Sequence, residues 1–145
     1  MPLKDTYILL GSAGSGKSTQ AELLKSSLHL AHIDIGAELR AVAAHDTDLG
    51  RQVNEIINVK HEFVPDDVVF AVLTDAVHSV PETVGLLIDG IPRRESQISR
   101  VLELLQESGR INSGQFQSSY LHNSFGIVHS KLLLIMCSDS HGTHF

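Results

Sequence analysis

The chain has 145 residues, a formal net charge of -6 and a pI near 5.8. This length fits one domain with a sizeable core, and the acidic balance gives no electrostatic support for binding nucleic acid or an anionic membrane surface. The only cysteine, Cys137, excludes an intramolecular disulfide, and no apolar run reaches the ~20 residues that span a bilayer. We therefore expect a cytoplasmic monomer with no nucleic-acid partner and no membrane partner.

Three short apolar segments in the first 110 residues have the character of buried strands. They are residues 7–10, 32–35 and 84–90, and the third ends in Asp89 and Gly90. Continuous apolar runs of this length are typical of parallel strands that are covered on both faces. The pattern therefore predicts a buried parallel sheet.

Helical spacing of apolar residues fills the intervals between these strands, over residues 16–28, 37–79 and 95–107. Asp66 and Asp67 follow a proline and are interpreted as the acidic first turn of a helix, not as a catalytic pair. The apolar faces expected for the first and last helical segments are formed by Ala21, Leu24 and Leu28, and by Ile98, Val101, Leu102 and Leu105. Strands that alternate with helices predict an α/β fold.

The composition changes near Gly109. From residue 111 to the end, the only formally charged side chains are Lys131 and Asp139. Residues 131–136 are apolar and predict a possible fourth strand. We therefore divide the chain into a core at 1–110 and a divergent tail at 111–145.

A phosphate-binding motif of the form G-x-x-x-x-G-K-[ST] lies between the first strand and the first helix. Glycines allow successive backbone N–H groups to point at phosphate oxygens, and the helix N-terminus adds partial positive charge. The lysine supplies a cation, and the serine hydroxyl is a ligand for Mg²⁺. The expected ATP-binding residues are Gly11, Ser12, Ala13, Gly14, Ser15, Gly16, Lys17, Ser18 and Thr19.

A second acidic position completes the expected metal site. Asp89 ends an apolar strand, and the carboxyl ends of parallel strands are where α/β sheets bind ligands. The alternative is that Asp89 caps the following turn. Beside a complete phosphate-binding loop we favour a role with Mg²⁺, shared with Ser18.

Several motifs together resemble one family, the adenylate kinases. The sequence GSAGSGKSTQ, from Gly11 to Gln20, resembles their phosphate-binding loop, and HIDIGAELR, from His32 to Arg40, resembles the start of their AMP-binding segment. The sequence DGIPR, from Asp89 to Arg93, resembles D-G-F-P-R with its downstream glutamine, here Gln97. The resemblance covers about residues 6–110 and implies a P-loop sheet with a helical AMP-binding insertion at about 36–79.

The resemblance also implies roles for individual residues. Lys17 and Arg93 are the expected catalytic residues. Arg40 and Arg93 match the arginines that hold the AMP phosphate, and Gln97 matches the residue that reads the adenine edge. The full expected AMP site is Gly36, Arg40, Val64, Gly90, Arg93 and Gln97. The implied reaction is reversible phosphoryl transfer from Mg·ATP to AMP.

The chain also departs from the family pattern. Ile35, Ala37 and His61 stand where a threonine, an aspartate and a glycine are common, which leaves the choice between AMP and another monophosphate open. No arginine follows Arg110, so the arginines of the family's lid have no counterpart, and we expect the lid and the C-terminal part of the core to be missing. The alternatives are a nucleotide-binding protein without turnover, such as a truncated paralogue, a splice or gene-model product or a regulatory partner, and an interaction module that binds no nucleotide.

Overall fold

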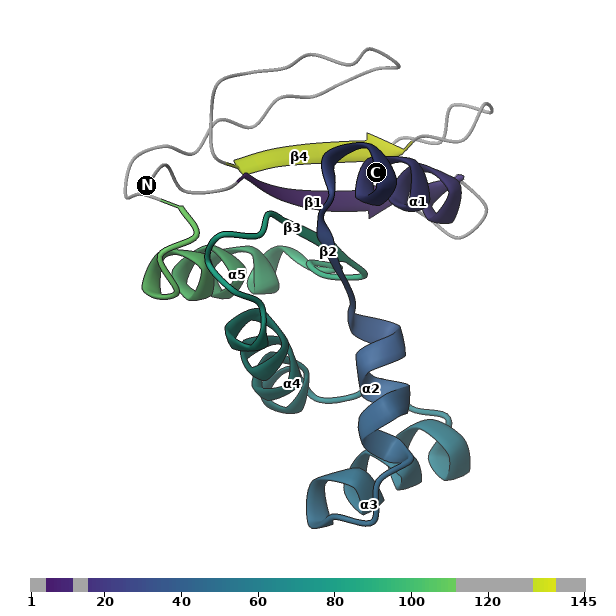
Figure 1. Ribbon diagram of the computed structural model, residues 1–145. Coiled ribbons are helices and arrows are strands. Elements are labelled where there is room, and N and C mark those ends of the chain that lie inside the picture. Colours follow the sequence, from purple (N-terminus) through teal and green to yellow (C-terminus); the bar gives the residue numbers. More distant parts are fainter. Residues whose placement is uncertain (1–4, 12–15, 112–131, 138–145) are drawn as a thin grey trace.

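A computed structural model describes residues 5–11, 16–111 and 132–137, the last of these by backbone only. The centre of the fold is a four-stranded parallel sheet with the strand order β2-β3-β1-β4 (Figure 1). The strands are β1 Thr6–Gly11, β2 Ala31–Asp34, β3 Leu86–Asp89 and β4 Leu132–Cys137. The predicted α/β class is confirmed, and the possible fourth strand is observed one residue later than expected.

The two faces of the sheet are apolar because side chains alternate along each strand. Ile8 and Ile88 belong to the larger core cluster, whereas their neighbours Leu9 and Leu87 belong to a smaller cluster on the opposite face. All four side chains are at most 2% exposed. Burial on both faces explains why these strands are continuous apolar runs in the sequence.

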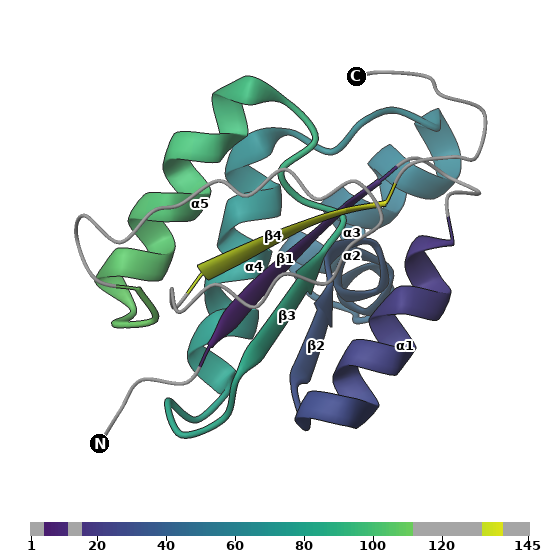
Figure 2. The ribbon, with the colours of Figure 1, turned by 90° about the horizontal axis from the view of Figure 1, so that it is seen from above.

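Helices cover both faces of the sheet, as Figure 2 shows from above. Helix α1, Lys17–Leu28, packs Ala21 and Leu24 against the smaller cluster. Helix α4, Asp66–Ser79, and helix α5, Glu95–Glu107, contribute to the larger cluster on the other face. The sheet therefore lies between two helical layers, and the carboxyl ends of its strands remain at one edge.

The segment between β2 and β3 is mainly helical, as predicted. Helix α2 spans Ile35–Ala43, helix α3 spans Asp48–Asn54, and the π-helical turn η1 spans Glu55–Lys60. Helix α2 starts directly after β2, because the Asp34 side chain accepts a hydrogen bond from the Ala37 N–H at 3.1 Å and caps the helix. Ile35 was expected in the strand and is the first residue of this helix.

Two apolar positions were assigned to the wrong helix face. Leu28 is 46% exposed and Ile98 is 41% exposed, although both fit the expected helical spacing. Leu28 is the last residue of α1, and its helix ends there. The buried face of α5 instead contains Gln97, Val101, Leu104 and Leu105. A polar residue, Gln97, thus occupies the inward position that Ile98 was expected to hold.

Arg110 ties the end of α5 to the loop before β3. Its guanidinium donates to the carbonyl oxygens of Val84 and Val80 at 2.6 Å each and to that of Pro81 at 3.2 Å. The residue is 3% exposed, and burial lowers the pKa of Arg110. Three carbonyl acceptors satisfy the buried donors and hold the entrance to β3.

Candidate functional site

The turn between β1 and α1 carries the predicted phosphate-binding loop. Gly11 ends β1, and Gly16 caps α1 with a φ of 81°, a left-handed conformation that favours glycine. Lys17 is the first helical residue, and the first turn contains no acidic side chain to offset the positive end of the helix dipole. Ser18 and Thr19 are exposed in that turn. Ser12, Ala13, Gly14 and Ser15 lie outside the described residues.

Asp89 lies beside this loop, between two nitrogen-bearing side chains. Its Oδ1 lies 3.1 Å from Lys17 Nζ, and its Oδ2 lies 3.6 Å from His32 Nε2. The Asp89 side chain is 9% exposed, yet within the described part of the chain neither its Oδ1 nor His32 Nε2 has a hydrogen-bond partner. The ion pair with Lys17 partly offsets the cost of burying Asp89 Oδ1, whereas a buried polar atom without any partner is uncommon in protein interiors and costly there. The sequence interpretation missed His32, because no local pattern links it to Asp89.

A pocket of about 480 Å³ opens at the same edge of the sheet. Its walls come from the start of α2, the segment before α4 and the loop between β3 and α5. All six residues expected to hold AMP line this one pocket: Gly36, Arg40, Val64, Gly90, Arg93 and Gln97. Gly90 directly follows Asp89, so the pocket and the Lys17–Asp89 pair are adjacent.

Steric contacts explain why glycine occupies the two positions 36 and 90 in this pocket. Gly90 has a φ of +90°, and a Cβ on it would lie 2.8 Å from Ile35 Cγ2. A Cβ on Gly36 would lie 3.2 Å from a terminal nitrogen of Arg40. The absence of a side chain thus allows Ile35 and Arg40 to approach the backbone around the pocket.

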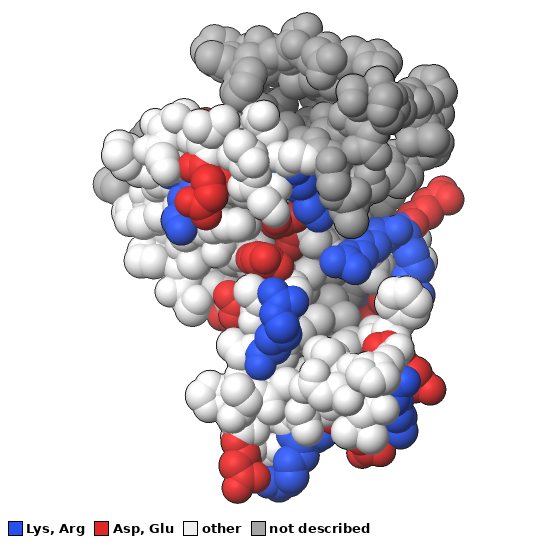
Figure 3. Space-filling view, turned by 90° about the vertical axis from the view of Figure 1, so that its right-hand side faces the viewer, with Lys and Arg blue, Asp and Glu red and all other residues white. Residues whose placement is uncertain are grey.

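The arginines differ in how they are neutralised. Arg51, Arg94 and Arg100 each pair with at least one aspartate, and Arg110 is held by backbone carbonyls. Arg40 and Arg93 have no carboxylate within 4.0 Å among the described residues, and both line the pocket. Figure 3 shows blue and red side chains close together on one face, as ion pairing produces. The pocket therefore holds two guanidinium groups that form no salt bridge with a carboxylate of the described residues, although Glu62 also lines it.

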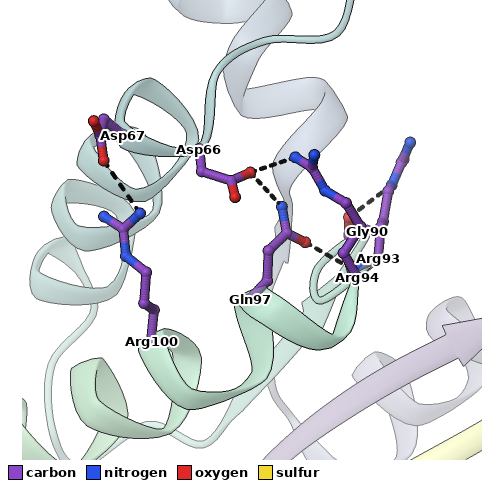
Figure 4. Close-up of polar contacts among 7 residues, drawn as sticks. All are labelled: Asp66, Asp67, Gly90, Arg93, Arg94, Gln97 and Arg100. Atoms are coloured by element: carbon purple, nitrogen blue, oxygen red, sulfur yellow. Dashed lines mark hydrogen bonds and ion pairs between the residues drawn. The ribbon is translucent and has the colours of Figure 1, made fainter.

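Gln97 is buried at the back of this site, and both ends of its amide are engaged. Its Oε1 accepts a hydrogen bond from the Arg93 N–H at 2.8 Å, and its Nε2 donates to Asp66 Oδ1 at 2.7 Å (Figure 4). Arg94 Nη2 lies 2.5 Å from the same Asp66 oxygen. Asp66 was interpreted as helix N-terminal charge, and this contact with α5 was missed.

A bound Mg²⁺ is implied by the family pattern, and the residues present fit it. Mg²⁺ takes oxygen ligands and is usually held by one or two protein groups together with substrate phosphates. Asp89 offers a carboxylate oxygen without a hydrogen-bond partner among the described residues. Ser18 is next in the sequence to Lys17, which forms an ion pair with Asp89. The described residues contain no cluster of three or more His, Cys, Asp or Glu that would hold a metal unaided.

The parallel sheet has the fold of the P-loop α/β class. Lys17 at the start of the first helix and Asp89 at the end of β3 lie at the positions typical of that class. A family model for adenylate kinase matches residues 9–115. The chain belongs to the adenylate kinase family.

Curated adenylate kinases are similar to this chain over much of its length. An adenylate kinase of Streptomyces coelicolor is 37% identical over 102 residues, which are 70% of this chain and 46% of the relative. One of Stenotrophomonas maltophilia is 37% identical over 103 residues, 71% of this chain and 54% of the relative. One of Latilactobacillus sakei is 40% identical over 90 residues, 62% of this chain and 41% of the relative. The chain thus spans about half the length of the curated relatives it matches.

Within the part of the chain that the structure describes, no helix has both the length and the apolar character needed to cross a bilayer.

Proposed function

We propose that the chain catalyses reversible transfer of the γ-phosphoryl group from Mg·ATP to AMP, giving ADP. One observation carries the proposal: Arg40 and Arg93 lack a carboxylate partner among the described residues and line a pocket next to the Lys17–Asp89 pair. Two planar cations in a pocket suit a phosphate dianion. A lysine at a helix N-terminus suits the phosphates of the donor.

The donor side of the site is formed by the turn before α1. Lys17, the backbone N–H groups from Gly11 to Gly16 and the start of α1 would hold the ATP phosphates, with the Thr19 hydroxyl nearby. Ser18 and Asp89 would hold Mg²⁺, directly or through water. When bound, the ion neutralises charge on the phosphate oxygens. Lys17 lies 3.1 Å from Asp89 Oδ1, which supports placing both groups at one cluster of phosphates.

The acceptor side is formed by the pocket. Arg40 and Arg93 would hold the AMP phosphate, and the Gln97 amide would bind the base. Gly36, Val64 and Gly90 line the same space and would contact the nucleoside. The Arg93 Nε donates to the Gly90 carbonyl at 2.9 Å, which fixes the stem of the side chain and supports a defined position for its guanidinium.

The chemical step requires no strong base. A phosphate oxygen of AMP, already anionic, attacks the γ-phosphorus, and the bond to the β–γ bridging oxygen breaks to leave ADP. Lys17 and Arg93 would stabilise the charge of the transferring phosphoryl group. Positioning and charge stabilisation provide most of the catalysis in this class of reaction.

The domain assignment is part of the proposal. We assign the kinase core to residues 1–110, with the AMP-binding segment at about 36–79, and the divergent tail to 111–145. The protein would act as a monomer with ATP and AMP as its partners.

Nucleotide binding without turnover is the second candidate, and the distribution of arginines favours it. The sequence contains no arginine after Arg110. An arginine that contacts the transferring phosphoryl group contributes a rate factor of about 10³ or more in related chemistry.

ADP formation from ATP, AMP and Mg²⁺ separates the two candidates, with Lys17→Ala as the test variant and Lys25→Ala as its match on the same helix. Kinase activity should fall about 10³-fold in Lys17→Ala and remain unchanged in Lys25→Ala. A folded wild-type protein that binds both nucleotides but forms no ADP supports binding alone. Equal turnover in wild type and Lys17→Ala rules out the proposed role of the loop.

A further inference from the structure

A chain of hydrogen bonds joins the base of the pocket to the start of α4. It runs from the Arg93 N–H to Gln97 Oε1 and from Gln97 Nε2 to Asp66 Oδ1, over 2.8 and 2.7 Å (Figure 4). Asp66 is 31 positions before Gln97 in the sequence, and it belongs to a different helix. The contact therefore arises from the tertiary fold and not from local helix geometry.

These two partners fix the orientation of the Gln97 amide. A backbone N–H only donates, and an ionised carboxylate only accepts. If the amide were rotated by half a turn, its NH₂ would face the Arg93 N–H and its oxygen would face the Asp66 carboxylate. Gln97 is 5% exposed, so water cannot easily relieve such mismatched pairs. One orientation of the amide is therefore strongly preferred.

The amide retains hydrogen-bonding capacity after these contacts. A glutamine side chain has two donor hydrogens and two acceptor lone pairs. The contacts to Arg93 and Asp66 use one of each. One N–H and one lone pair remain in a fixed order, on a side chain that lines the pocket.

We propose that Asp66 is a positioning residue that makes the pocket select a 6-aminopurine over a 6-oxopurine monophosphate. The inference rests on the proposed function, because it takes the pocket as the monophosphate site. Adenine has a donor at position 6 beside a ring-nitrogen acceptor, and a 6-oxopurine has an acceptor at position 6. An amide of fixed orientation matches only one of these two orders, whereas a rotating amide accommodates both.

The position of Asp66 at the start of α4 and its contact with Arg94 hold its carboxylate beside Gln97. It is the first residue of α4, where the helix dipole stabilises a carboxylate, and its Oδ1 lies 2.5 Å from Arg94 Nη2. Its side chain is 27% exposed. These interactions hold the Asp66 Oδ1 against the Gln97 amide, where it acts as a hydrogen-bond acceptor.

Asp67 provides a matched control on the adjacent position. Its side chain is 92% exposed and pairs with Arg100 at 3.2 Å, away from Gln97 (Figure 4). Asp66→Asn and Asp67→Asn remove the same charge from the same helical turn. Only the first exchanges an obligatory acceptor of the Gln97 amide for a group that also donates.

The test measures the dissociation constants of AMP and IMP for the full chain by calorimetry, in wild type and in both variants. IMP differs from AMP in the group at position 6 and in the adjoining N1–H. The wild type should prefer AMP, and Asp66→Asn should reduce this preference about threefold to tenfold. Asp67→Asn should leave the preference unchanged. An unaltered preference in folded Asp66→Asn would overturn the inference.

A measurement on the wild type covers the case in which Asp66→Asn does not fold. The side-chain amide hydrogens of Gln97 should exchange with solvent at least about tenfold more slowly than those of the exposed Gln52 and Gln106. Equal exchange overturns the fixed orientation.

The outcomes also separate this inference from the proposed function. A wild type that binds neither AMP nor IMP removes the proposed function and the inference with it. A wild type that binds AMP and IMP equally well overturns the inference alone.

Discussion

Asp89 lies on the phosphate side of the candidate site and Asp66 lies behind the pocket. The two carboxylates differ in burial and in hydrogen bonding. Asp89 is 6% exposed and lies between Lys17 and His32, but its Oδ1 has no hydrogen-bond partner among the described residues. Asp66 is more exposed, and its Oδ1 accepts hydrogen bonds from both Gln97 and Arg94. In the first carboxylate, Oδ1 faces the Lys17 ammonium but has no hydrogen-bond partner among the described residues, whereas in the second carboxylate Oδ1 accepts two hydrogen bonds.

This difference separates two kinds of polar group in a binding site. Burying a carboxylate without hydrogen bonds lowers the stability of the fold, and such groups are retained where a function uses them. A satisfied carboxylate stabilises the fold and fixes its neighbours. This contrast supports the proposed roles of Asp89 in the phosphate chemistry and of Asp66 in the geometry of the base site.

Neutralising each carboxylate should separate these roles in turnover. Asp89→Asn should reduce ADP formation about 10²-fold or more and raise the Mg²⁺ concentration needed for half-maximal rate, because a metal ligand is lost. Asp66→Asn should retain most of its maximal rate at saturating AMP. ADP formation measured across a Mg²⁺ titration checks both. An equal loss in the two variants, with an unchanged Mg²⁺ requirement in Asp89→Asn, would remove the contrast.

The arginines extend the same contrast to cations. Arg40→Gln and Arg93→Gln should each weaken AMP binding about 10- to 100-fold, because each removes charge-assisted hydrogen bonds to the phosphate. Calorimetric titration with AMP measures the loss.

A matched variant and a matched ligand control this prediction. Arg51→Gln should bind AMP as the wild type does, because Arg51 is already paired with Asp46 and Asp48. Adenosine, which lacks the phosphate, should bind all four proteins equally. If Arg51→Gln loses as much AMP affinity as Arg40→Gln, then pairing with an aspartate does not distinguish these arginines.

The sequence was sufficient to predict the parallel sheet and six of the residues that line the pocket. The strands were predictable because their residues are apolar on both faces of the sheet, as Ile8, Leu9, Leu87 and Ile88 show. The expected AMP residues were chosen by resemblance to a family, and the fold brings them to one pocket. Leu28 was misassigned because helical spacing continues to the last residue of α1, whereas the buried contacts end earlier.

The polar contacts between elements distant in the sequence could not be predicted from the sequence. Asp66 has the local signature of a helix start, which is correct, and nothing nearby in the chain indicates that Gln97 lies 2.7 Å away. His32 approaches Asp89 only because β2 and β3 pair in parallel, with His32 two residues before Asp34, the register partner of Asp89, and hence on the same face of the sheet. Such contacts depend on strand register and helix placement, which residue patterns do not specify.

The smallest expected difference between Asp66 and Asp89 is in the free energy of unfolding. Asp66→Asn should lower the free energy of unfolding by about 1–2 kcal/mol, since a partly exposed charge-assisted pair with Arg94 is weakened. Asp89→Asn should leave the free energy of unfolding unchanged or raise it, because a buried carboxylate whose Oδ1 has no hydrogen-bond partner among the described residues is replaced by a neutral amide. Urea denaturation followed by circular dichroism gives both values.

Asp67→Asn sets the baseline for this comparison. Its pair with Arg100 is exposed, so the midpoint of thermal unfolding should shift by no more than about 2 °C. A stability loss in Asp89→Asn larger than that in Asp66→Asn would mean that the Lys17–Asp89 pair is a structural ion pair. The proposed role of Asp89 in phosphate chemistry would then rest on turnover alone, and the lack of a hydrogen bond to its Oδ1 from the described residues would have no bearing on function.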